Sequence, residues 1–409
     1  MEELMRKYAE VLLKTCLKIE KDQPLLITYN IERSDFVRIV TEEAYKLGVK
    51  DIYYDMSDPY IRKEALKNLE VEELKKLTFW NKEIWNVYAK KNAAFLMLAS
   101  ETPGLMKDVD PKKISEMTKY ALSTRKEFDD LRDKSMISWT IAAVPTKRWA
   151  DELFKEENSV EILWNKIFDI CSIKEDDPVS IWNDKIDKLN RRAEKLNSYR
   201  FKTLIYKSSN GTDFKIKLPE KHLWASGREV LQNKKEVLVN FPTEEVFTSP
   251  DCRSAEGIVY SSKPLSYQGV IINNFNISFK EGKVIDCHAK EGEDTLKELI
   301  NICENSDMLG EVALVPNDSP ISNSNQVFLE TLYDENAACH LALGDSFTEC
   351  IENGPNMKKE DLFNNYNLNK CDSHTDFMIG TSDLNITGIT QDNKEVPIFI
   401  NGNFTKDFE

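Results

Sequence analysis

The order of apolar runs and amphipathic helices in the first half of the chain restricts its fold more than any other feature. Residues 1–19 carry apolar side chains mostly at three- and four-residue intervals, which predicts an amphipathic helix. The short apolar run PLLITYN follows, and Ser34 and Asp35 can then cap a helix that Gly48 ends before the next run, DIYYD. A strand, a helix and a second strand in this order predict a β-α-β unit with parallel strands.

Further strand-like runs at 93–100 and 138–146 alternate with helical segments rich in Lys and Glu. We therefore expect residues 1–190 to form an α/β domain whose sheet is mostly parallel. The charged segment 183–200 has helical spacing and is typical of a connecting helix at a domain boundary.

The pattern changes after this connecting segment. Two strand-like runs flank an Asn-Gly turn at 210–211, and three more runs follow: EGIVYSS, GVIINNFNISFKEGKVIDCHA and PIFINGNF. Helices are expected near 294–307 and 334–349. Residues 191–409 are thus predicted to form an α+β domain rich in antiparallel strands.

The charge of the chain restricts its partners. It has 55 basic and 70 acidic residues, a net charge of −15, so it lacks the basic surface that would displace counterions from nucleic acids or anionic membranes. No run of 18 apolar residues occurs, and the first residues lack the apolar core of a signal peptide. We expect a cytoplasmic protein that binds neither nucleic acid nor membrane.

Several common motifs are missing from the sequence. Neither G-x-G-x-x-G nor G-x-x-x-x-G-K-[ST] occurs, so a nucleotide-binding function for the β-α-β unit is the weakest of the alternatives. The eight cysteines form no C-x-x-C pair, which argues against a zinc ribbon and against a disulfide framework. We expect most of them to be buried thiols.

Two histidine segments could contribute metal ligands. His374 and Asp376 lie two residues apart in a strand-like run, so both side chains share one face. His340 follows Asn336 by four residues, the spacing of a helix turn, and Glu335 would need to lie at a helix start or a bend to share a ligand set with it. The ordinary alternatives are a surface pair for the first segment and a core histidine for the second.

Acidic residues also border apolar runs. Glu244 and Glu245 lie in NFPTEEVF, and Glu311 opens the run EVALV. An ionised carboxylate at the end of a buried strand is unfavourable unless it is paired or binds a metal, although an exposed loop or strand start would also explain each one. Carboxylate oxygens and imidazole nitrogens without a thiolate cluster suit Zn, Co or Mn in a hydrolytic site.

Five segments together, in this order and spacing, resemble the M29 family of thermophilic aminopeptidases, also called aminopeptidase T or aminopeptidase S. They are NFPTEEVFTSPD, EGIVYSSKPLSYQGVII, LGEVALVP, LYDENAACHLALGD and HTDFMIG. The segment AAVPTKRWADELF at 142–154 is similar to the first domain of that family, so the resemblance covers essentially the whole chain.

The resemblance implies an exopeptidase that uses two divalent ions, Zn, Co or Mn, to hydrolyse peptides from a free N-terminus. It also implies a homodimer in which the first domain covers a catalytic metal domain. Carried over motif by motif, the metal ligands fall on Glu245, Glu311, Glu335, His340, His374 and Asp376. His222 and His288 match no ligand of the family motifs, and we expect neither to bind metal.

The resemblance leaves two points about catalysis open. A carboxylate close to the attacking water could accept its proton, with Glu244 as the first candidate and Glu311 as its competitor. The family commonly has a tyrosine seven residues after the motif histidine, and Phe347 occupies that position here. Loss of an oxyanion donor would raise the barrier by roughly 3 kcal/mol. A relative that binds metal and peptide but has weak or no activity is therefore the alternative function.

Overall fold

The computed structural model describes the backbone of residues 1–409 and all side chains except those of residues 78–82. The chain divides into two compact units. Unit 1 comprises Met1–Ile186 and Gly227–Thr243, and unit 2 comprises Asp187–Ser226 and Glu244–Glu409. The segment Gly227–Thr243 departs from the division at residue 190 expected from the sequence, because its strand β10 pairs with β4 of the first unit.

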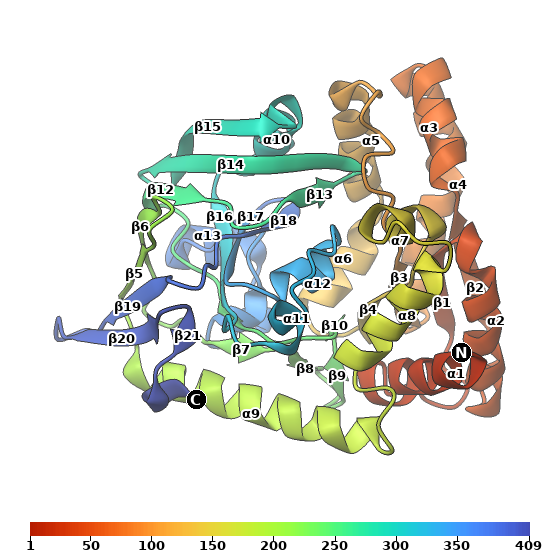
Figure 1. The fold of residues 1–409 in the computed structure, drawn as a ribbon, viewed down its shortest axis with the longest axis horizontal. Helices are drawn as coiled ribbons and strands as arrows, with labels where there is room; N and C mark the ends of the chain where they lie inside the picture. The colour runs from red at the N-terminus through yellow and green to blue at the C-terminus, as the bar shows by residue number, and fades with distance from the viewer. The chain divides into compact units, whose positions relative to one another are not determined.

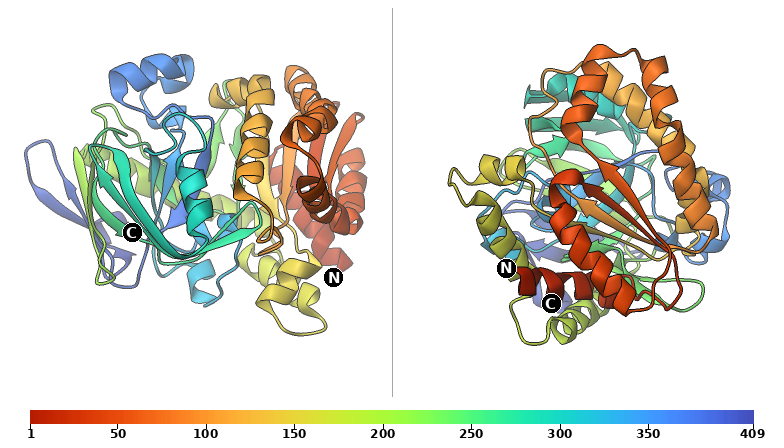
Figure 2. Two further views of the ribbon diagram at one scale, coloured as in Figure 1. Left: turned by 90° about the horizontal axis from the view of Figure 1, so that it is seen from above. Right: turned by 90° about the vertical axis from the view of Figure 1, so that its right-hand side faces the viewer.

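Unit 1 is built on a five-stranded sheet with the strand order β10-β4-β3-β1-β2, and neighbouring strands are parallel. This confirms the mostly parallel sheet predicted for the first half. Strands β1, β2 and β3 run side by side in red to orange in the right-hand view of Figure 2. Their bounds are Leu25–Asn30 for β1, Ile52–Ser57 for β2, Ala94–Ala99 for β3, Trp139–Ala143 for β4 and Asn240–Phe241 for β10.

The predicted β-α-β unit is β1, α2 and β2 (Figure 1). The cap expected at Ser34 is supplied earlier, where Asn30 Oδ1 accepts a hydrogen bond from the Glu32 N–H at 3.0 Å. Gly48 has φ +88° and ends α2 as predicted. The helices of unit 1 are α1 Glu2–Val11, α2 Ser34–Lys46, α3 Pro59–Asn68, α4 Val71–Lys90, α5 Pro111–Thr124, α6 Lys126–Asp133, α7 Lys147–Leu153 and α8 Ser159–Ile170.

A long helix, α9 (Pro178–Tyr199), carries the chain from unit 1 to unit 2. It corresponds to the connecting helix predicted over 183–200. Its 22 residues are long enough to span a bilayer, but charged residues run along its length. Across the described residues, no helix is both long enough and apolar enough to cross a membrane.

Unit 2 contains a large antiparallel sheet in the order β13-β14-β12-β6-β5-β19-β20-β21, with β15 paired to β14. The predicted Asn-Gly turn joins β5 to β6, and Gly211 adopts φ +106° there. The long hairpin of β14 and β15 stands out in Figure 2. The bounds are Thr203–Lys207, Asp213–Lys217, Glu256–Tyr260, Leu265–Tyr267, Val270–Lys280, Lys283–Glu291, Asn385–Ile389, Glu395–Ile400 and Asn403–Phe404 for β5, β6, β12, β13, β14, β15, β19, β20 and β21.

A second antiparallel sheet of unit 2, in the order β18-β17-β16-β11-β7, lies in the interior. Phe377 of β18 contacts Phe275 of β14, with 6.0 Å between ring centroids, so this face packs on the larger sheet. The alternation of side chains along a strand turns His374 and Asp376 to the other face. The bounds are Ala225–Ser226 for β7, Val246–Thr248 for β11, Leu309–Leu314 for β16, His340–Gly344 for β17 and His374–Met378 for β18.

A bulge in β16 changes which face one acidic side chain occupies. The pairing of β16 with β17 shifts by one residue at Gly310, so that Glu311 pairs with Ala342. Without this extra residue Glu311 would pair with Leu341 and point to the opposite face. A Cβ atom on Gly310 would lie 2.0 Å from the main-chain oxygen of Asp345, so the bulge requires glycine.

The helix predicted over 334–349 is wrong. Helix α12 covers only Thr331–Glu335, and β17 begins at His340. Every residue of β17 is buried, and an apolar run of this kind has no period by which a strand can be told from a buried helix. The helix expected near 294–307 is shorter, since α10 spans Glu293–Ile300. Two other helices of unit 2 are α11 Pro320–Asn323 and α13 Lys359–Tyr366.

His222 is completely buried in unit 2 and makes the stability of the fold depend on pH. Its Nδ1 atom lies 2.7 Å from the main-chain oxygen of Pro219, whereas Nε2 has no hydrogen-bond partner among the described residues. Burial lowers the pKa of this imidazole to about 4. The folded protein therefore holds His222 neutral at pH values where the unfolded chain already binds a proton.

We expect the unfolding free energy to fall by about 3 kcal/mol from this group alone as the pH is lowered from above 6.5 towards 4. The sign follows from the lowered folded-state pKa, because the unfolded state gains the proton first. Urea unfolding of the wild type and of His222→Asn between pH 4 and 8 measures the difference in slope. Equal slopes for the two proteins would contradict the assignment.

Candidate metal centre

The proposed site residues of the sequence converge on one face of the smaller sheet of unit 2. Across the three strands β16, β17 and β18, Glu311, Ala342 and Asp376 form one paired row. His340 pairs with Ala313, two residues along the same strands. Because paired residues share a face, both rows place their acidic and imidazole side chains on the same side of the sheet. The small side chains of Ala313 and Ala342 leave space between these polar groups.

The first group of possible ligands contains Glu245, Glu311 and His340, all buried. Glu245 lies directly before β11, and its Oε2 atom is 3.1 Å from His340 Nε2. One ligand atom from each residue lies within 4.8 Å of the others, which is close enough to surround a single ion.

The second group contains Glu311, His374 and Asp376, and it shares Glu311 with the first. His374 Nε2 lies 3.1 Å from Glu311 Oε2 and 3.3 Å from Asp376 Oδ1. The shared carboxylate therefore stands between two sets of ligands, one around each imidazole.

Main-chain oxygens fix both imidazoles in the same tautomer. His340 Nδ1 lies 3.0 Å from the oxygen of Glu335, and His374 Nδ1 lies 2.8 Å from the oxygen of Asp345. In each ring Nδ1–H donates to the carbonyl, so Nε2 is the atom that faces the carboxylates, and it can bind a cation once it gives up its proton. This is the arrangement that orients histidine ligands in metal sites.

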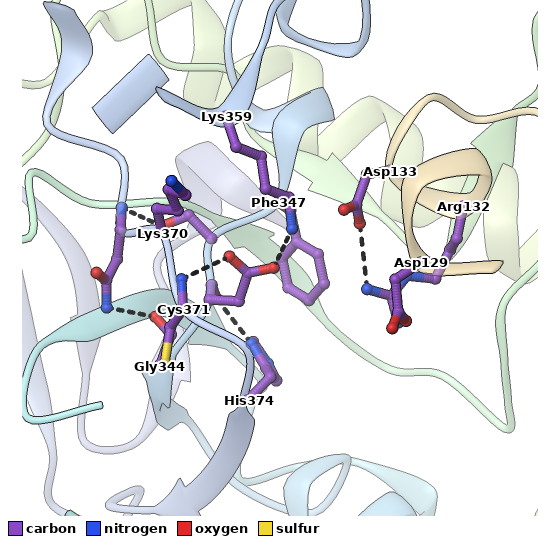
Figure 3. A network of polar contacts seen from close by, with 12 residues as sticks. Asp129, Arg132, Asp133, Gly344, Phe347, Lys359, Lys370, Cys371 and His374 are labelled. Atoms are coloured by element: carbon purple, nitrogen blue, oxygen red, sulfur yellow. Dashed lines mark hydrogen bonds and ion pairs between the residues drawn. The ribbon is translucent and has the colours of Figure 1, made fainter. Parts of the chain in front are cut away.

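The loop after β17 holds His374 in place (Figure 3). The Asp345 carboxylate accepts a hydrogen bond from the Cys371 N–H at 3.2 Å and forms an ion pair with Lys359. Its main-chain oxygen accepts the proton of His374 Nδ1. Asp345 was not among the residues expected at the site, and its only signal in the sequence is the Gly-Asp pair that ends the apolar run HLALGD.

Burial and crowding shift the pKa values of the cluster. Burial raises the pKa of Glu311 to about 7. Burial alone would lower the pKa of His340, but its hydrogen bond with Glu245 and the surrounding negative charge outweigh this effect and raise it to about 10. The cluster therefore carries excess negative charge that stabilises positive charge, whether it is a proton or a metal ion.

Glu335 lies beside the two groups but belongs to neither. It ends α12, and its carboxylate accepts a hydrogen bond from Asn336 Nδ2 at 3.3 Å. Burial raises the pKa of its carboxyl well above the usual range, and the charges of Asp376 and Glu245, one from each group, raise it further. Glu335 lies at the end of α12 rather than at a helix start, and the chain leaves the helix before His340 begins β17.

Glu244 belongs to neither ligand group, unlike its neighbour Glu245. Its main-chain N–H donates to Asn336 Oδ1 at 2.7 Å, and its charge acts on the buried guanidinium of Arg192. Phe347 lies directly before a short 3-10 helix rather than on a helix with His340. The Phe347 ring packs 4.8 Å from the His374 ring, measured between centroids.

The other two histidines lie apart from both groups. His222 is buried against Pro219, and His288 is an exposed residue of β15 near Asp286 and Glu293. Neither belongs to the ligand groups found among the described residues.

The donor set fits a divalent cation. Carboxylate oxygens and imidazole nitrogens suit zinc, cobalt or manganese in a hydrolytic site. Asp376 Oδ1 is buried and receives no hydrogen bond within the described part of the chain, although His374 Nε2 lies nearby. A buried acceptor of this kind is expected where a cation completes the site.

Comparisons with known proteins identify the family. A sequence model of the thermophilic metalloproteases (M29) matches residues 1–404. Aminopeptidase AmpS of Bacillus subtilis is 38% identical over 403 residues, 98% of each chain. Aminopeptidase T of Thermus thermophilus is 31% identical over 401 residues, 97% of each chain.

A solved structure agrees with these sequence matches. Wild-type AmpT from Thermus thermophilus superposes with a TM-score of 0.88 at 30% identity, covering 98% of this chain and 99% of that one. The family resemblance of the motifs is thereby confirmed over both units. The chain belongs to the M29 family of thermophilic metalloproteases.

Proposed function

We propose that this protein is a metal-dependent aminopeptidase that removes residues from the free N-terminus of peptides. Family membership supports the metalloprotease chemistry, and the names of the full-length relatives support the exopeptidase specificity. The observation that carries the proposal is the pair of overlapping ligand groups, which share the buried carboxylate of Glu311.

Two divalent ions fit this pair of groups better than one. Each group supplies one imidazole Nε2 and one carboxylate of its own, and Glu311 belongs to both, so these five residues would hold the two ions. Glu335 completes the proposed set, because its buried carboxylate is close enough for the charges of Asp376, Glu245 and Glu311 to act on it. The ligands proposed are Glu245, Glu311, Glu335, His340, His374 and Asp376.

Bound divalent ions would supply Lewis acidity, which activates water at neutral pH and polarises the scissile carbonyl. The chain itself must then accept the proton of the water. Glu311 is better placed for this role than Glu244, because Glu311 belongs to both ligand groups, whereas Glu244 belongs to neither and its charge acts on Arg192.

Four further features expected from the sequence remain part of this proposal. They are a homodimer, a first domain that covers the metal domain, a cytoplasmic location, and partners limited to peptides, without nucleic acid or membrane. A relative that binds metal and peptide without turnover stays the alternative, motivated by Phe347 alone. Hydrolysis of aminoacyl chromogenic substrates by metal-loaded protein separates the two.

We expect Glu311→Gln and His340→Ala to remove metal-dependent hydrolysis and to lower the bound metal below that of the wild type, while the protein still folds. The physical reason is that each change removes a ligand from a buried site with few spare donors. Metal content by mass spectrometry, turnover and circular dichroism measure the three effects. The matched control is His288→Ala, which removes an exposed imidazole outside both groups. Near-normal turnover and metal content in either ligand variant would refute its assignment.

We expect Gly310→Ala to weaken metal binding at least about 10-fold, because the bulge can no longer form and Glu311 leaves the face of the imidazoles. The matched control is Gly282→Ala, at the turn between β14 and β15, where a Cβ would lie 2.2 Å from the oxygen of Cys252. Both variants should lose stability, but only the first should lose affinity for zinc when titrations use folded protein. Equal affinities in the two variants would show that the bulge does not position the ligand.

We expect Phe347→Tyr to raise turnover by roughly 10-fold to 10³-fold with little change in KM, since a hydroxyl beside His374 could stabilise the transition state. Phe347→Leu serves as the control, because it removes the ring that packs on the imidazole without adding a donor. Turnover and melting temperature are measured side by side. Unchanged or lower turnover in a less stable Tyr variant would assign Phe347 a packing role only.

A further inference from the structure

Two cysteines of unit 2 lie in contact although 68 residues separate them in the sequence. Cys303 Sγ is 2.9 Å from Cys371 Sγ. This is shorter than a van der Waals contact between sulfur atoms and about 0.9 Å longer than a disulfide bond. The hydroxyl of Ser373 lies 3.4 Å from the first sulfur and 3.3 Å from the second. Both cysteines are free thiols in the structure.

Hydrogen bonds between the two loops fix this approach. Asn305 Nδ2 donates to the oxygen of Lys370 at 3.0 Å, and Asn369 Nδ2 donates to the oxygen of Asn305 at 2.9 Å. Asn369 also donates to the oxygen of Gly344 at 2.6 Å, which ties the same loop to β17. The sulfur atoms are therefore held together by contacts that do not involve the thiols.

The two thiols differ in access to solvent. Cys303 is partly exposed, whereas Cys371 is only 7% exposed. The hydrogen bond from the Cys371 thiol lowers the pKa of Cys303 below its usual range, so the Cys303 thiol is the more readily ionised of the two. The six other cysteines of the chain are buried.

We propose that Cys303 and Cys371 form a site of reversible oxidation, in which a peroxide converts the two thiols into a disulfide. The Cys303 thiolate attacks one oxygen of hydrogen peroxide, the O–O bond breaks, and the departing hydroxide takes up a proton to become water. The sulfur of Cys371 then attacks the sulfenic sulfur of Cys303, the S–S bond forms, and the S–O bond breaks with loss of a second water. Two thiols and one peroxide thus give one disulfide and two waters, and a dithiol reductant reverses the change by thiol exchange.

The disulfide would act on the metal centre through a short covalent path. Cys371 precedes His374 by three residues, and both are bound to Asp345, the first through its main-chain N–H and the second through Nδ1 (Figure 3). Closing the S–S bond moves the segment that carries His374, and a displacement near 1 Å at a catalytic centre can lower turnover as much as about 10²-fold. This regulatory step rests on the proposed aminopeptidase function, whereas the disulfide itself does not.

The experiment uses full-length protein purified with a reductant and loaded with zinc, which has no redox chemistry of its own. It is treated with hydrogen peroxide, then digested without reduction and mapped by mass spectrometry. The variants are Cys303→Ser and Cys371→Ser, and the matched control is Cys287→Ser, a buried cysteine on β15. Circular dichroism confirms that each variant folds, and turnover and zinc content are measured before oxidation, after oxidation and after addition of dithiothreitol.

The expected result is a peptide that links Cys303 to Cys371 in the wild type and in Cys287→Ser, but in neither of the other variants. Turnover should fall at least about 3-fold with the link and return with dithiothreitol, and Cys303→Ser should be insensitive to the same treatment. Cys303 oxidised to sulfinic acid without a linked peptide would overturn the proposal. A linked peptide with unchanged turnover and zinc content would overturn its regulatory step. If the reduced protein hydrolyses no substrate, the proposed function is refuted. The presence or absence of the linked peptide still tests whether the disulfide forms.

Discussion

Glu311 shares a face with His340 and His374 because β16 gains one residue at Gly310. In a regular strand the same carboxylate would point with Leu341 towards the opposite side of the sheet. The bulge is tolerated because glycine has no Cβ to meet the main-chain oxygen of Asp345. A single backbone irregularity therefore decides whether two imidazoles have a carboxylate in common.

The same strands serve the core and the polar cluster at once. Alternation along β18 sends Phe377 to Phe275 on the larger sheet and turns His374 and Asp376 to the other face. Burying so many ionisable groups is unfavourable unless each finds a partner of opposite charge. Main-chain carbonyls hold both imidazoles and carboxylates surround them, so the polar face is ordered by the sheet and by the loop at Asp345.

Sequence patterns predicted what depends on local order and missed what depends on pairing between distant segments. The β-α-β unit and the shared face of His374 and Asp376 follow from periods of 3.6 and 2 residues. His340 was expected on a helix, because the uniformly apolar run around it has no period to favour a strand. The bulge at Gly310, the return of Gly227–Thr243 to unit 1 and the contact of two cysteines 68 residues apart leave no local signal. Only the motifs as a set indicated that Glu245, Glu311 and His340 belong together.

The discontinuity of unit 1 has a consequence for how this protein could be divided or recombined. The chain crosses between units at Ile186, at Ser226 and at Thr243, so neither unit corresponds to one continuous stretch of gene. A truncation after the connecting helix would remove β10 and expose the edge of β4 to pairing with other chains. The last crossing falls two residues before Glu245. An exchange of unit 1 between relatives would therefore have to join foreign sequence directly beside the metal centre. For this reason we expect the two units to evolve as one piece rather than to be exchanged separately.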